Sequence, residues 1–292
     1  MTLQELIQTG AEQFTQAGIS FGHGTTNAHD EATWLALWRL GLPLDVDDLE
    51  LNRSLTPAES AQVTALFEER IATRKPAAYL TREAWLQGFA FYVDERSIVP
   101  RSFIAELLVD GTIDYWLSDT TQRVLDLCTG NGSLGLIATQ VYPEVTVVGA
   151  DISPEALAVA GINVERYSMN TRMALVQSDG LTGVQGTFDL ILCNPPYVNA
   201  QSMNQLPAEY RAEPELALAG GTDGMDFIRT LLRDLPTRMN DNAVLVLEIG
   251  NERPYFESAF PDLSDHAIWL ETSAGADQVV LLEKVAMKNT IL

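Results

Sequence analysis

The sequence predicts an α/β fold: a mostly parallel sheet of seven strands that ends in an antiparallel hairpin, preceded by a small N-terminal helical domain. Three observations predict it. Apolar residues recur at helical spacing up to about residue 75. From Arg123 onward, apolar strands alternate with helical segments, which is typical of a parallel sheet covered on both faces. The last two apolar segments flank a short turn at 274–277, which favours the terminal hairpin.

The N-terminal helices are predicted from apolar stripes and one capping box. A first helix carries on one face Leu3, Leu6, Ile7 and Phe14. A second helix holds Trp34, Leu35, Leu37, Trp38 and Leu40. A third begins at Thr56, with Pro57 at its first position and Glu59 completing the box, and ends near Thr73. Such stripes favour a helical-bundle core over a cofactor site.

A change of period follows between Trp85 and Arg101. Phe89, Phe91 and Val93 alternate with other residues, which predicts a β-hairpin. We expect this hairpin to link two domains and a helix over 102–117 to open the second. The predicted parts are a helical domain over 1–84, a hairpin linker over 85–101 and a sheet domain over 102–292.

The sheet domain is predicted from short apolar runs and the segments between them. The strands are Val124–Leu127, Val145–Ala150, Ala174–Val176, Phe188–Cys193, Ala243–Ile249, Ala267–Glu271 and Val279–Glu283. The helices between them are Ser133–Val141, Pro154–Tyr167 and Met225–Met239.

The composition is that of an acidic globular protein, with 46% hydrophobic residues and a net charge of −22 from 40 acids against 18 bases. That charge disfavours phosphate backbones and attracts cationic partners, although a need for solubility explains it equally well. No long apolar run and no signal-peptide pattern occur, so we expect a cytoplasmic protein without membrane contact. Two cysteines and three scattered histidines predict free thiols and no metal site.

A glycine-rich turn, residues 126–133, follows the first strand of the sheet. Glycines permit a sharp turn and a close ligand approach at the carboxyl end of a parallel sheet. Gly130, Gly132 and Gly135 also satisfy the dinucleotide pattern, so the turn alone leaves NAD, another nucleotide or no ligand open.

Acidic residues at the following strand ends narrow the choice of ligand. Asp151 ends the second strand, where a carboxylate accepts hydrogen bonds from both ribose hydroxyls. Asp179 lies past the third strand, where it could meet an adenine ring or simply form a turn. Asp126 could reach a sulfonium ligand or its amino group, whereas an anionic pyrophosphate would gain little from it. Together they favour a cationic, adenosine-bearing ligand.

The tetrapeptide Asn194-Pro195-Pro196-Tyr197 follows the fourth strand at the same sheet edge. Two prolines fix the backbone extended and donate no hydrogen bond. The Asn194 side-chain oxygen and the Pro195 carbonyl could therefore hold both protons of an NH₂ group, while Tyr197 offers a flat face to a planar amide or base. Positioning, rather than a strong base, would carry such a reaction.

With these motifs the sequence resembles the class I methyltransferases of Rossmann-like fold that carry Asn-Pro-Pro-Tyr. Within them it resembles the protein-glutamine methyltransferases that act on release factors and on a ribosomal protein. The likeness covers nearly the whole chain. The stretches 91–102 and 206–218 and the Leu-Cys-Thr-Gly form of the glycine loop resemble the branch that methylates large-subunit ribosomal protein three.

The resemblance implies S-adenosyl-L-methionine as cofactor and a basic ribosomal protein as substrate. It implies that the cofactor contacts are Asp126, Thr129, Gly130, Asn131, Gly132, Asp151, Ile152, Asp179 and Asn194. Asn194, Pro195, Pro196 and Tyr197 would hold the glutamine amide. The sequence departs from the pattern at Cys128, where many methyltransferases have glycine, and at 274–278, which leaves the role of the terminal hairpin open.

Other functions stay open at this stage. An adenine-specific DNA or RNA methyltransferase would present the same NH₂ geometry, but clustered Lys and Arg are sparse, and we expect no direct DNA binding. A release-factor methyltransferase, a dehydrogenase and a non-catalytic binding module are further alternatives. We expect the helical domain to recognise the substrate and its removal to leave cofactor binding intact.

Overall fold

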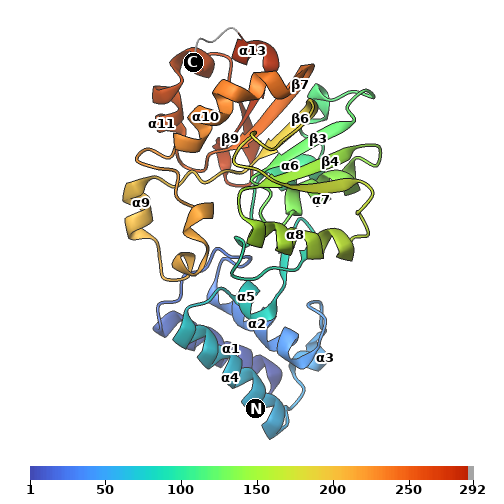
Figure 1. The fold of residues 1–292 in the computed structure, drawn as a ribbon. Helices are drawn as coiled ribbons and strands as arrows, with labels where there is room; N and C mark the ends of the chain where they lie inside the picture. Colours follow the sequence, from blue (N-terminus) through green and yellow to red (C-terminus); the bar gives the residue numbers. More distant parts are fainter. Residues whose placement is uncertain (289–292) are drawn as a thin grey trace.

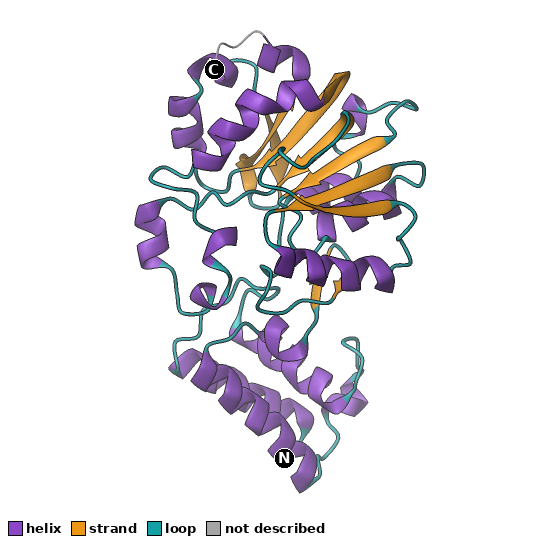
Figure 2. Cartoon of the chain, viewed as in Figure 1, coloured by secondary structure: helices purple, strands orange, loops and turns teal. Residues whose placement is uncertain are grey.

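The computed structural model describes residues 1–288. A helical part and a sheet part lie end to end (Figure 1). Strands form the centre of the larger part and helices cover them on both sides (Figure 2). This arrangement confirms the predicted fold class.

The helical part packs around its own apolar core. Its helices are α1 (Leu3–Gln16), α2 (Ala28–Leu40), α3 (Asp48–Leu51), α4 (Pro57–Thr73) and α5 (Ala77–Thr81). The ring of Phe14 from α1 meets Phe67 of α4 edge-on at 5.3 Å between centroids. The predicted capping box is present, because Glu59 N donates to Thr56 Oγ1 and Thr56 N donates to the Glu59 carboxylate.

The larger part is one mixed sheet with helical connections. Its strands are β3 (Arg123–Leu127), β4 (Thr146–Asp151), β5 (Met173–Gln177), β6 (Phe188–Cys193), β7 (Met239–Glu248), β8 (Ile268–Thr272) and β9 (Gly275–Glu283). Its helices are α6 (Ile104–Val109), α7 (Ser133–Val141), α8 (Pro154–Arg166), α9 (Ala200–Gln205), α10 (Asp226–Asp234), α11 (Arg253–Ala259), α12 (Pro261–Ser264) and α13 (Lys284–Lys288). Short 3-10 turns lie at Asp114–Trp116, Tyr210–Ala212, Glu215–Ala217 and Leu235–Arg238.

The strand order within residues 1–288 is β5-β4-β3-β6-β7-β9-β8. Strands β3 to β7 pair in parallel, and β9 pairs antiparallel with both β7 and β8, which confirms the predicted terminal hairpin. The chain proceeds from β3 to β4 and β5 on one side and to β6 and β7 on the other. The order therefore reverses between β3 and β6, and such a switch point opens a crevice at the carboxyl ends of the strands.

The central strands are continuous apolar runs because both of their faces are covered. One face packs against α10 to α13 and the other against α6, α7 and α8. Leu125 and Leu127 of β3 belong to the first core and Val124 to the second, each at most 1% exposed. This rigid layer fixes the strand ends that carry the predicted site.

Two predicted helices are shorter than expected. The helix expected over 102–117 is confined to α6, since Gly111 adopts φ +73° and a 3-10 turn follows. The helix expected over 225–239 ends with α10 at Asp234 because Pro236 follows in a 3-10 turn.

The hairpin β1 (Ala84–Leu86) and β2 (Phe89–Phe91) lies between the two parts. Leu86 and Phe91 pack into the core of the sheet part, whereas Ala84 and Val93 pack into the helical core. The linker thus belongs to both cores, and the boundaries at 84 and 101 stay predictions.

Candidate active site

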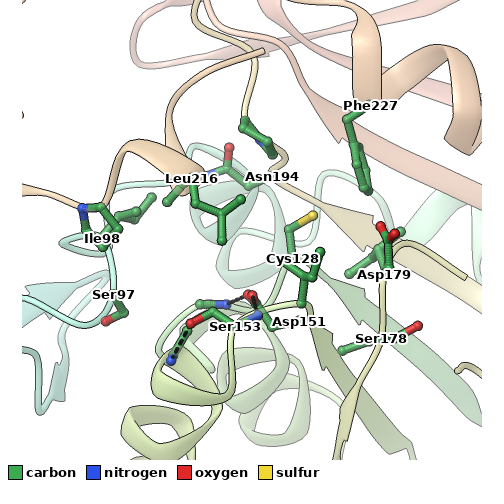
Figure 3. A pocket seen from close by; sticks show the side chains of 18 of the residues that line it. Ser97, Ile98, Cys128, Asp151, Ser153, Ser178, Asp179, Asn194, Leu216 and Phe227 are labelled. Carbon is green, nitrogen blue, oxygen red and sulfur yellow. Dashed lines mark hydrogen bonds between the residues drawn. The ribbon is translucent and has the colours of Figure 1, made fainter. Parts of the chain in front are cut away.

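A pocket of about 230 Å³ opens at the switch point, over the ends of β3 and β6. Figure 3 shows Cys128, Asp151, Asp179, Asn194, Leu216 and Phe227 around it. Its lining residues are Arg96, Ser97, Ile98, Leu127, Cys128, Gly130, Ala150, Asp151, Ile152, Ser153, Ala156, Ser178, Asp179, Gly180, Asn194, Pro196, Pro214, Leu216, Ala217 and Phe227. Five predicted cofactor contacts therefore meet in one cavity: Gly130, Asp151, Ile152, Asp179 and Asn194.

The glycine loop holds the carboxylate at the end of β4. Gly130 N donates to Asp151 Oδ2 over 2.9 Å, and Ser153 N donates to Oδ1 over 3.0 Å. Gly130 has φ +55°, which glycine adopts without strain, whereas Cys128 takes φ +59° as a non-glycine residue. The sharp turn thus aims backbone N–H groups at Asp151. Burial raises the pKa of this carboxyl above its usual value.

Asp126 and Thr129 lie beneath the loop rather than on the pocket wall. Thr129 Oγ1 and Gly135 N donate to Asp126 Oδ2, so this carboxylate closes the turn from below. Asp126 Oδ1 is buried without a partner. Burial raises the pKa of Asp126 to about 7. An unpaired carboxylate oxygen in this place suits a cationic donor.

Asn131 and Gly132 also lie outside the lining. Gly132 caps α7 at φ +83°, and Asn131 Oδ1 accepts a hydrogen bond from Ser133 N over 3.2 Å. Asn163 of α8 donates to the carbonyls of Asn131 and Tyr92, each over 2.9 Å, and so ties the loop to the segment after the hairpin. Their direct contact with a ligand stays a prediction.

The tetrapeptide divides between the pocket and the structure behind it. Asn194 and Pro196 line the cavity, Pro195 is buried, and Tyr197 turns away to donate from its hydroxyl to Glu248 Oε1 over 3.2 Å. Burial, with the Glu248 charge, raises the pKa of Tyr197, so its hydroxyl stays protonated. Tyr197 therefore braces the motif. Its contact with a flat substrate group stays a prediction.

Three glycines surround this tyrosine. A Cβ at Gly250 would lie 2.5 Å from Tyr197 Cε2, and a Cβ at Gly220 would lie 2.7 Å from Tyr197 Cα. Gly224 packs equally tightly on the Tyr197 carbonyl. Only glycine fits so close, so these positions fix the tetrapeptide sterically.

Glu248, at the end of β7, escaped the sequence analysis. Its Oε2 accepts from Ser102 Oγ over 2.6 Å and from Phe103 N over 2.9 Å. Burial raises its pKa despite these bonds. The sequence did offer a signal for Glu248, because an acidic residue there ends an apolar run at the carboxyl edge of the sheet. Phe227 and the wall residues Pro214, Leu216 and Ala217 carried no such signal, because they reach the pocket only through the folded chain.

The two thiols adjoin the pocket. Cys128 lies on its wall and Cys193 is fully buried at the end of β6. The neighbouring Cys193 thiol and burial raise the pKa of Cys128, which keeps it protonated and unreactive. The expectation that both cysteines serve packing stays a prediction.

Within residues 1–288, no cluster of three or more His, Cys, Asp or Glu is placed to hold a metal ion. Over the same residues, no helix combines the length and the hydropathy that a membrane crossing requires.

Comparisons with known proteins place this chain in a family. The model of the "Methyltransferase small domain" family matches residues 106–210. A protein of Burkholderia pseudomallei (strain K96243) named ribosomal protein uL3 glutamine methyltransferase is 47% identical, covering 96% of this chain and 94% of its own length. A protein of the same name from Neisseria gonorrhoeae (strain ATCC 700825 / FA 1090) is 46% identical, covering 97% and 94%.

Among solved structures, the hMettl16 catalytic domain in complex with MAT2A 3′UTR hairpin 6 has a TM-score of 0.52 at 13% identity, covering 80% of this chain and 84% of that chain. At this identity the likeness concerns the fold alone. The relatives span nearly all of the chain, and with them the expected ribosomal-protein branch is confirmed: the chain belongs to the ribosomal protein uL3 glutamine methyltransferase family.

Proposed function

We propose that this protein transfers a methyl group from S-adenosylmethionine to the side-chain amide nitrogen of a glutamine in ribosomal protein uL3. The observation that carries the proposal is the shared cavity at the switch point. Asp151 and Asp179 lie on one side of it, and Asn194 of the tetrapeptide lies on the other. One pocket thus offers contacts to a nucleoside and to an amide.

The residues present fit the cofactor. Asp151 is oriented by Gly130 N and Ser153 N, which leaves its carboxylate facing the pocket as an acceptor for ribose hydroxyls. Asp179 and the Phe227 ring flank the space in which an adenine would stack. The unpaired Asp126 Oδ1 suits the amino group of the methionine part. S-adenosylmethionine, when bound, supplies an electrophilic methyl group.

The tetrapeptide would orient the amide. Asn194 Oδ1 and the Pro195 carbonyl are acceptors for the two N–H groups, which turns the nitrogen lone pair toward the methyl donor. The amide nitrogen is a poor nucleophile, so correct placement must supply most of the acceleration. The same acceptors stabilise the positive charge that grows on nitrogen. The proton can leave to water after transfer, and no strong base is required.

The choice of uL3 rests on the relatives and on charge. Proteins that match over nearly the whole chain carry that name. A net charge of −22 attracts a basic ribosomal protein and repels nucleic acid. The expected absence of direct DNA binding stays part of the proposal.

The test is transfer of labelled methyl from S-adenosylmethionine into purified undermethylated uL3, release factor and DNA, side by side. We expect label in uL3 alone and its loss in Asn194→Ala. Label in release factor would reassign the substrate, and label in DNA would overturn the charge argument.

A further inference from the structure

Residues 206–218, here called the strap, connect the helical part to the pocket wall. The strap follows α9 and passes beside the helical part before it returns to the sheet (Figure 1). Leu216 and Ala217 line the pocket close to its end. Val198 N donates to Leu218 O over 2.9 Å, which joins the strap directly to the residue after the tetrapeptide.

The first anchor of the strap is Glu209, which is 1% exposed. Arg74 Nη1 donates to Glu209 Oε1 over 3.2 Å, and Arg70 Nη1 lies 3.5 Å from the same oxygen. Both arginines belong to the helical part. Arg70 is itself fully buried and donates through Nε to Glu31 over 2.8 Å. The anchor is therefore a buried charge cluster across the two parts.

The second anchor is Glu213, which is 4% exposed. Arg101 donates two parallel hydrogen bonds to it, over 2.6 and 2.8 Å, and Val99 N donates a third over 2.9 Å. His23 of the helical part lies on the other side, with Nε2 3.3 Å from Glu213 Oε2 and its ring 4.3 Å from Tyr210. Burial opposes ionisation, but Arg101 and His23 lower the pKa of Glu213 to about 2.

The geometry makes these contacts interdependent. A buried carboxylate that loses a charged partner is strongly disfavoured. Glu209 takes both of its arginine partners from the helical part, and Glu213 takes His23 from it. Pro214 follows Glu213 directly and lines the pocket. A displacement of Glu213 should therefore also displace the pocket wall, since Leu216 lies only three residues further along the chain.

We propose that the helical part positions the active-site wall: through Glu209 and Glu213 it holds the strap, and with it Leu216 and Ala217, against the pocket. Glu213 is a positioning residue. The helical part then acts on cofactor binding as well as on substrate recognition, which revises the expectation that its removal leaves cofactor binding intact. The inference rests on the proposed function for the identity of the ligand.

The test compares three full-length variants. Glu213→Gln keeps the shape of the side chain and removes the charge. His23→Phe keeps a ring against Tyr210 and removes only the contact that the helical part makes with Glu213. Phe14→Leu is the control, because it weakens the helical core without touching the strap. The measurements are the melting temperature, the Kd of S-adenosylhomocysteine, kcat on uL3 and hydrogen exchange over residues 206–218.

We expect Glu213→Gln to raise the Kd about tenfold, equivalent to about 1.4 kcal/mol of binding free energy, and to lower kcat about 10²-fold because the pocket wall is misplaced. His23→Phe should also raise the Kd and lower kcat, and it should speed hydrogen exchange in the strap. If Glu213→Gln does not fold, His23→Phe provides the test. Phe14→Leu should lower only the melting temperature.

The inference would be overturned if the Kd, the kcat and the hydrogen exchange of the strap were the same in all three variants as in the wild type. A wild-type protein that binds no S-adenosylhomocysteine would instead overturn the proposed function, and the inference with it. The two outcomes are distinguishable, because the inference is tested by the variants and the proposed function is tested by the wild-type protein.

Discussion

Gly250→Ala tests the claim that Tyr197 braces the tetrapeptide 194–197. The new Cβ would lie 2.5 Å from Tyr197 Cε2 and 3.1 Å from Cζ. Ordinary carbon contacts are about 3.5–4.0 Å, so the ring must move by about 1 Å. Such a shift breaks the 3.2 Å hydrogen bond to Glu248. A misplacement of about 1 Å costs about 10²-fold in rate, and we expect that loss in kcat.

Gly41→Ala is the matched control. Gly41 has φ +67°, close to the +55° of Gly250, and a Cβ there would meet no atom within 4 Å. Both variants carry a left-handed backbone cost of about 1–2 kcal/mol, but only Gly250→Ala displaces Tyr197. Urea unfolding measures the shared stability loss, and steady-state methylation of uL3 measures the difference. A kcat for Gly250→Ala within about threefold of Gly41→Ala would refute the bracing role.

Three further predictions concern the acceptor, the buried acid and the charge. Asn194→Ala should lower kcat by about 10²–10³-fold, measured by labelled methyl transfer. Burial raises the pKa of Asp126 to about 7, so the carboxylate is mostly protonated at pH 6 and mostly ionised at pH 8. The proposed contact between Asp126 and the cationic amino group of the cofactor requires the ionised carboxylate. Calorimetry should therefore show affinity for S-adenosylmethionine rising through pH 7, and Asp126→Asn should remove that rise. Added salt should slow association with basic uL3, measured by stopped flow, and leave the cofactor Kd nearly unchanged, because screening acts on long-range attraction between surfaces.

The strands and both motifs were predictable because they depend on local patterns. Continuous apolar runs marked β3, β4, β6 and β7, and their order along the chain implied a shared carboxyl edge. Gly130, Asp151 and Asn194 could therefore be expected together, and they line one pocket. The spacing of apolar residues was enough to locate these strand ends, and no knowledge of long-range contacts was needed.

The support of the site was not predictable, because it depends on pairs far apart in the chain. Arg101 and Glu213 are 112 positions apart, and Tyr197 and Glu248 are 51 apart. Nothing local distinguishes Glu213 from a surface acid in a chain with 40 acidic residues. Similarly, the need for glycine at 250 arises from a ring that only the fold brings near.

The most direct test of the account is to locate the methyl group by tandem mass spectrometry of uL3 incubated with the protein and S-adenosylmethionine. We predict one added methyl on the side-chain amide of a single glutamine, absent when Asn194→Ala replaces the wild type. Methylation of a lysine, arginine or backbone nitrogen, or equal methylation by the variant, would contradict it.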